Sequence, residues 1–223
     1  MTRYNRVVIE TGSKKVIASA IDWPGWCRLA KTEDEALEML RAYAERYQPV
    51  ATVAGVDGVE AASTSFNVVE RVRGTATTDF GAPDAPAEVE AGTMTDADCE
   101  RQIALMRGCW QVFDDTAGRV SEELQKGPRG GGRDRTKLVA HTLEAERSYA
   151  RKIGVSTPKG GMDTPEGLAA HREAVVEAIR RINADPDIAT TWPLRYFIRR
   201  AAWHVMDHAW EMQDKDLTWQ SDD

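Results

Sequence analysis

Apolar side chains recur every three or four residues over a long stretch of the second half of the chain, the spacing of one face of an α-helix. The stripe consists of Ile103, Met106, Trp110, Phe113, Ala117, Val120 and Leu124. Asp96 can cap the start of this helix, and Gly127 with Pro128 would end it. The pattern therefore predicts one long helix between these two signals.

Three further helices are predicted after it, at about residues 136–153, 164–182 and 192–215. Gly154 ends the first of these, and Pro165 suits the first turn of the second. The last is apolar nearly all round, as expected of a helix buried on most sides. Long helices joined by loops of moderate length, with few strand signals among them, predict a four-helix bundle.

The first third of the chain has a different pattern, with short β-rich runs separated by turns. Strands are predicted at residues 6–10, 16–21, 26–29 and 65–72. Thr32 followed by Glu35 forms a capping box before an apolar pattern of helical spacing. The sequence therefore predicts a small β-β-β-α-β domain ahead of the bundle, and an α+β chain of two domains.

Composition sets the boundaries between these parts. Residues 78–95 are rich in Ala, Pro, Gly, Asp and Glu, which is typical of a linker. The predicted organisation is an α+β domain at 1–77, the linker at 78–95, the bundle at 96–215 and a polar tail at 216–223. The 223 residues, 42% of them hydrophobic, suffice for two small cores.

The charge and the apolar content of the chain indicate where the protein is expected to reside and which partners it is expected to bind. No apolar run approaches the roughly 20 residues that span a bilayer, and the first residues lack the apolar core of a signal peptide, so a soluble, cytoplasmic protein is expected. The whole formal net charge of −7 falls in residues 78–223, which carry nineteen basic and twenty-six acidic side chains. This acidity argues against a nucleic-acid partner. The three cysteines are expected to be reduced and mostly buried.

The four histidines are the main candidates for chemistry. His204 and His208 lie four residues apart on the predicted last helix, so one metal ion can bridge both imidazoles. The alternative is a pair of core histidines hydrogen-bonded to backbone or carboxylate groups. A third ligand could come from His141 or from His171, and their spacing does not choose between them.

Two segments, GPRGGGRDRTKLVAHTLEAERSYARKIG and RRAAWHVMDHAWEMQDK, resemble the DinB-like superfamily, also called the YfiT-like metal-dependent hydrolases, over residues 96–215. The resemblance implies a four-helix bundle that binds a divalent metal, often zinc or nickel, through His141, His204 and His208. It also implies a small-molecule substrate and either a thiol S-transferase or isomerase reaction, with a thiol such as mycothiol, bacillithiol or glutathione, or hydrolysis by activated water.

The segment DWPGWCRLAKTEDEALEML resembles the core of HicB-like domains, which are antitoxin-type β-β-β-α-β modules. This resemblance covers the first third of the chain and rests on a turn and a capped helix. It leaves open a second class of function, in which the protein is a non-catalytic, metal-stabilised stress-response or partner-binding protein that uses this domain to bind its partner.

Charged residues near the histidines could complete an active site. Glu144, Asp207 and Glu211 are candidate bases or ligand-orienting groups, and Glu211 continues the histidine stripe. Arg129 and Arg133, in a glycine-rich loop before His141, could bind the carboxylates of a thiol cofactor or an acidic substrate.

The last helix contributes two further groups of side chains. Arg195, Arg199 and Arg200 add positive charge and could face solvent or a partner subunit. Trp203 and Trp210 could form a homodimer surface, although burial within one chain explains them equally well.

Overall fold

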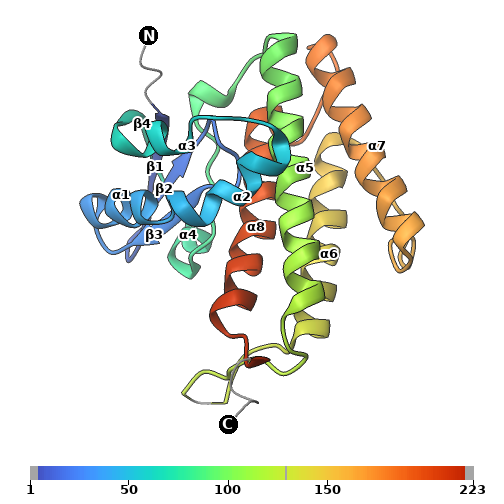
Figure 1. Cartoon of the computed structure of the whole chain (residues 1–223). Helices are drawn as coiled ribbons and strands as arrows, with labels where there is room; N and C mark the ends of the chain where they lie inside the picture. Colours follow the sequence, from blue (N-terminus) through green and yellow to red (C-terminus); the bar gives the residue numbers. More distant parts are fainter. Residues whose placement is uncertain (1–4, 129, 219–223) are drawn as a thin grey trace.

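The structure, a computed structural model, describes residues 5–128 and 130–218. It is a mixed α+β structure in which a four-stranded sheet lies against a bundle of long helices (Figure 1). The strands are β1 (Asn5–Thr11), β2 (Val16–Ala20), β3 (Cys27–Ala30) and β4 (Phe66–Arg73). The helices are α1 (Glu33–Ala42), α2 (Ala44–Ala54), α3 (Val59–Thr64), α4 (Ala76–Phe80), α5 (Asp96–Arg119), α6 (Arg135–Ala150), α7 (Pro165–Ala184) and α8 (Leu194–Asp214). Short 3-10 helices are η1 (Glu88–Glu90) and η2 (Arg151–Ile153).

The sheet has the strand order β3-β2-β1-β4. β1 and β2 form an antiparallel hairpin, β3 continues it, and β4 returns parallel to β1 after α1, α2 and α3. The four predicted strands are therefore confirmed. The predicted capping box is present at the start of α1, where the Thr32 hydroxyl accepts from the Glu35 amide and the Glu35 carboxylate accepts from the Thr32 amide.

The bundle helices follow the predictions except at the two ends of α5. Its N-cap is Thr95, whose hydroxyl accepts from the Asp98 amide, and not the predicted Asp96, which is the first residue of the helix. This helix ends at Arg119, because Val120 has extended backbone, and does not continue to Gly127. Val120 and Leu124 are nonetheless buried, and the Ser121 amide donates to the carboxylate of Asp216 at 2.9 Å. Their apolar spacing reflects burial in an extended segment at the end of the bundle, so the prediction of a longer helix was wrong.

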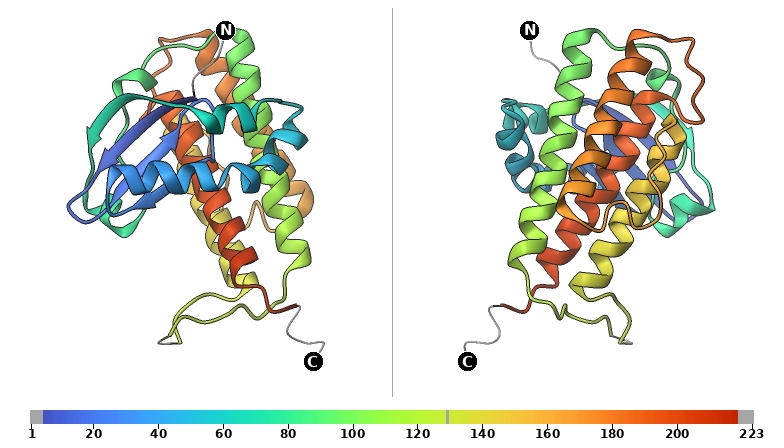
Figure 2. Two further views of the ribbon diagram at one scale, coloured as in Figure 1. Left: turned by 60° about the vertical axis from the view of Figure 1, so that its left-hand side comes forward. Right: turned by 90° about the vertical axis from the view of Figure 1, so that its right-hand side faces the viewer.

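Helix α8 is the central element of the molecule. It lies between the sheet on one side and α5, α6 and α7 on the other (Figure 2). Its buried residues surround the helix axis, as the sequence predicted. Trp203 and Trp210 are both buried within the chain, Trp203 beside Ile17 and Cys27 of the sheet.

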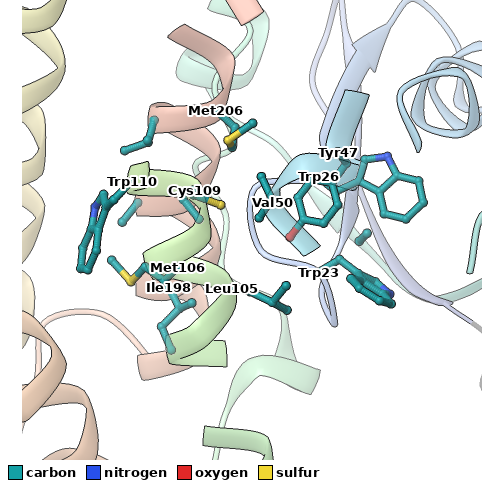
Figure 3. Close-up of a cluster of buried hydrophobic side chains, with 14 of the residues drawn as sticks. Trp23, Trp26, Tyr47, Val50, Leu105, Met106, Cys109, Trp110, Ile198 and Met206 are labelled. Atoms are coloured by element: carbon teal, nitrogen blue, oxygen red, sulfur yellow. The ribbon is translucent and has the colours of Figure 1, made fainter. Parts of the chain in front are cut away.

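The sheet region and the bundle share one continuous hydrophobic core. Figure 3 shows its central part, where Trp23, Trp26 and Tyr47 lie next to side chains of α5 and α8. α2 packs closely against α5, since a Cβ added at Gly108 would lie 2.6 Å from the carbonyl oxygen of Val50. The two predicted units are therefore held in fixed contact by apolar packing.

The segment predicted as the linker, residues 78–95, is packed against both parts. The carboxylate of Glu10 in β1 accepts hydrogen bonds from the amides of Asp84 and Ala85, and Glu90 is 1% exposed and forms an ion pair with Arg199 of α8. This segment therefore joins the sheet to one side of α8. Among the described residues, no helix combines the length and apolar character needed to cross a membrane.

Candidate metal centre

His204 and His208 project from the same face of α8, because four residues make slightly more than one helical turn. Their ring centroids are 4.5 Å apart. His204 is only 7% exposed, whereas His208 is partly accessible. One of the two imidazoles is therefore set deep in the bundle and the other lies nearer its surface.

The third histidine of this cluster is His141, which lies near the middle of α6. Its ring centroid is 5.2 Å from that of His204 and 5.1 Å from that of His208. One nitrogen from each ring can be chosen so that all three lie within 4.8 Å of one another. His171 is buried on α7 instead, with its Nδ1 2.7 Å from the hydroxyl of Thr157. The structure thus brings His141, and not His171, to the pair.

The three rings fit a divalent transition metal in chemistry and approximately in geometry. Burial, followed by the neighbouring His208 and Arg200, lowers the pKa of His204 to about 2, and burial also lowers the pKa of His141. Both rings are therefore neutral near pH 7, the form that binds a metal. Tetrahedral zinc with Zn–N bonds of about 2.0–2.1 Å places ligand nitrogens roughly 3.3 Å apart, so small side-chain movements would close the site.

Glu211 supports the cluster by holding His208. Its Oε2 lies 2.8 Å from Nδ1 of His208, and Lys215 donates to its Oε1 at 2.6 Å. The hydrogen bond from His208 is the main cause that lowers the pKa of Glu211 to about 2. Because the carboxylate is ionised, Nδ1 of His208 donates to it, which leaves Nε2 for a metal. A carboxylate of such low pKa orients its ligand and is a poor general base.

The other two candidate carboxylates are engaged elsewhere. Asp207 accepts a hydrogen bond from Arg28 of β3 at 2.6 Å, on the side of α8 that faces the sheet. Glu144 is exposed and forms an ion pair with Arg147 on its own helix. Neither side chain has a hydrogen bond to any of the three clustered histidines among the described residues.

The glycine-rich loop lies close enough to influence the cluster electrostatically. Arg133 is exposed, and its charge helps to lower the pKa of both His141 and His204. Arg129, the other candidate of this loop, lies outside the described residues.

Several aromatic and charged side chains next to the histidines were not assigned to the site from the sequence. The ring of Tyr149 lies 5.6 Å from that of His204 and 5.4 Å from that of Trp192. Arg200, one turn before His204, is 7% exposed. The sequence contained a signal for Lys215, because it follows Glu211 by four residues on the helix. The apolar spacing of residues 136–153 places Tyr149 on the inner side of α6, but it does not show which residues of α8 this ring meets.

The three cysteine thiols of the chain are not placed to react. All three cysteines are free and buried. Burial raises the pKa of Cys27 to about 11 and also raises that of Cys109. These cysteines are therefore held in the unreactive protonated form near pH 7.

Two cavities lie near the cluster without being lined by its histidines. One of about 1090 Å³ lies along α6 and is lined in part by Val139, Leu143 and Glu144. The other, of about 410 Å³, lies between β3 and the end of α8 and is lined in part by Arg28 and Glu211.

Comparisons with known proteins do not place the chain in a family. No family model, no curated protein and no solved structure matches it.

Proposed function

We propose that the protein is a metal-dependent enzyme in which His141, His204 and His208 hold a divalent transition metal, with zinc or nickel the preferred ions. The observation that carries this proposal is the convergence of three imidazole nitrogens within 4.8 Å from two helices. Three neutral protein ligands leave coordination positions open, as catalytic sites do and closed structural sites do not.

The residues around the cluster supply distinct contributions in this proposal. His204 provides a buried neutral nitrogen, and Glu211 fixes the orientation of His208 through Nδ1. The ring of Tyr149 contacts that of His204 in an edge-to-face arrangement and adds an apolar neighbour to the site. A divalent ion bound by such ligands lowers the pKa of a thiol or a water molecule and holds it as a nucleophile.

Between the two nucleophiles, we favour the thiol of a small cofactor such as mycothiol or bacillithiol, as an S-transferase or isomerase reaction requires. The resemblance of residues 96–215 to the DinB-like superfamily supports this choice, and hydrolysis by activated water is the alternative. The HicB-like resemblance of residues 1–77 supports a partner-binding role for the sheet region, which would act beside the metal centre or in place of catalysis.

Metal analysis is the first test. We expect about one transition-metal ion per chain after expression in metal-rich medium. His204→Ala should abolish binding and leave helicity largely intact. His171→Ala is the matched control, because it also removes a buried histidine but from outside the cluster, and it should retain the metal. A His204→Ala variant with native metal affinity would contradict the ligand assignment.

A second experiment separates the enzyme from the binding protein. The metal-loaded chain is incubated with a panel of small thiols and a generic electrophile, and separately with ester and amide substrates. Thiol-dependent turnover that is lost in His204→Ala supports a transferase. Turnover of esters or amides without added thiol supports a hydrolase. No turnover in either assay favours the non-catalytic protein.

A further inference from the structure

The guanidinium of Arg200 is buried beside the histidine cluster without a full set of hydrogen bonds. The residue is 7% exposed, and its Nε and Nη1 are both buried and have no hydrogen-bond partner among the described residues. A guanidinium can bind a carboxylate through two parallel N–H bonds along its side edge or its end edge. Nε belongs to the first edge and Nη1 to the second, so each of these edges includes an unpartnered donor.

The neighbouring residue shows that this chain can satisfy a buried arginine. Arg199 is 3% exposed, and its Nε and Nη2 donate to the two oxygens of Glu90 at 2.6 and 2.7 Å. A buried charge without such a partner is costly. Among the residues that the structure describes, none forms an ion pair with Arg200, and the fold does not explain why this charge is buried.

Two aromatic rings hold the Arg200 guanidinium in place. Its central carbon lies 4.5 Å from the ring centroid of Trp203 and 5.0 Å from that of Tyr149. Tyr149 also contacts His204, so one ring borders both the arginine and the histidine. Cation–π contacts stabilise the charge and orient the plane, and they leave the N–H donors at the edges available.

Arg200 lies on the same face of α8 as His204 and His208. Arg200, His204 and His208 follow one another at intervals of four residues, which is about 6 Å along the helix axis per interval. The charge of Arg200 lowers the pKa of His204, which reflects this proximity. A small molecule with its reactive group at the histidines can therefore extend a second group to Arg200.

We propose that Arg200 binds the carboxylate of the small molecule that reacts at the His141–His204–His208 centre, which makes the substrate or thiol cofactor a carboxylic acid. This inference rests on the proposed metal-dependent function. A carboxylate matches the single positive charge and the planar edges of one guanidinium, whereas a phosphate dianion would call for more than one cation.

The test measures ligand binding to the full-length, zinc-loaded chain by isothermal titration calorimetry. Mercaptopropionate and mercaptopropanol are the probes, because they share a thiol and differ in the carboxylate. The wild type should bind mercaptopropionate at least about tenfold more tightly. In Arg200→Met this preference should disappear while the affinity for mercaptopropanol and the zinc content stay unchanged. Arg195→Met, the same change on the same helix away from the histidines, should retain the preference.

Several outcomes would overturn the inference. Equal affinity of the wild type for the two thiols would do so, as would an unchanged preference in Arg200→Met or tighter Arg200-dependent binding of inorganic phosphate than of propionate. If Arg200→Met does not fold, Arg200→Lys keeps the charge, lacks the planar fork and should lose most of the preference. Failure of the metal proposal is recognised separately, by absence of zinc. In that event propionate titration of wild type and Arg200→Met still decides whether Arg200 binds a carboxylate.

Discussion

Helix α8 has two sides that differ in whether their buried charged side chains are paired. On the side that faces the sheet, Arg199 forms an ion pair with Glu90, and Arg28 of β3 forms an ion pair with Asp207. On the side that faces α6, Arg200 has unpartnered donors, and His204 and His208 lie on the following turns. The same helix thus joins the sheet to the bundle with satisfied ion pairs and presents unsatisfied groups to the candidate centre.

This difference distinguishes charged side chains that are buried to stabilise the fold from those that are buried to bind a ligand. A structural ion pair needs both partners within the chain, because a missing partner leaves an uncompensated buried charge. A binding site keeps its donors unpaired until the ligand arrives, so it costs stability in the free protein. The two sides of α8 should therefore respond differently to the same substitution.

Replacing each of the adjacent arginines by methionine is the most direct test of this contrast. Arg199→Met leaves Glu90 buried and unpaired and should lower the free energy of unfolding by about 3–5 kcal/mol. Arg200→Met removes an unsatisfied charge together with its aromatic contacts, and it should stay within about 1 kcal/mol of wild type. Denaturant unfolding of the two variants measures both values. Equal destabilisation by the two substitutions would remove the distinction between the sides.

His171 shows what burial alone does to a histidine in this chain, and it gives a prediction for pH. Burial lowers the pKa of His171 to about 4, from about 6.5 in the unfolded chain. Below pH 6.5 the unfolded chain binds more protons, so this contribution to stability is lost as the pH falls and levels off below pH 4.

The comparison variant is His171→Gln, which retains a polar side chain that does not titrate. Between pH 7 and pH 4, the free energy of unfolding of the wild type should fall by about 3 kcal/mol more than that of His171→Gln. Urea unfolding at each pH gives the two curves. Parallel curves would mean that the pKa of His171 is the same in the folded and the unfolded chain.

Much of the fold could be predicted from the sequence because local patterns determine it. The capping box at Thr32 and the helical period after Asp96 each depend on neighbouring residues only, and both led to elements that the structure contains. The period did not reveal the end of α5, since Val120 and Leu124 are buried outside a helix and keep the same spacing.

Part of the candidate centre could likewise be predicted from local sequence, and part depends on how the helices pack. His204 and His208 lie on one helix, so their spacing alone brings them together. The choice between His141 and His171 depends on how α6 and α7 pack on α8, which spacing within a helix does not encode. Arg199 and Arg200 were equivalent in sequence, and only the packing of residue 90 against α8 distinguishes them.

The acidic residues of α8 provide the finest test of its two sides. Glu211 holds His208 on the side of the centre, whereas Asp207 holds Arg28 on the side of the sheet. Glu211→Gln removes the charge that orients His208 and should weaken metal binding about 10–100-fold. Asp207→Asn is the matched control and should leave metal affinity unchanged, because its ion pair does not include a histidine. Competition with a chelator of known affinity measures both variants. If Asp207→Asn weakened metal binding as much as Glu211→Gln, the two sides of α8 would be coupled through the helix. The carboxylate of Asp207, which binds Arg28, would then also help to hold the metal ligands in place.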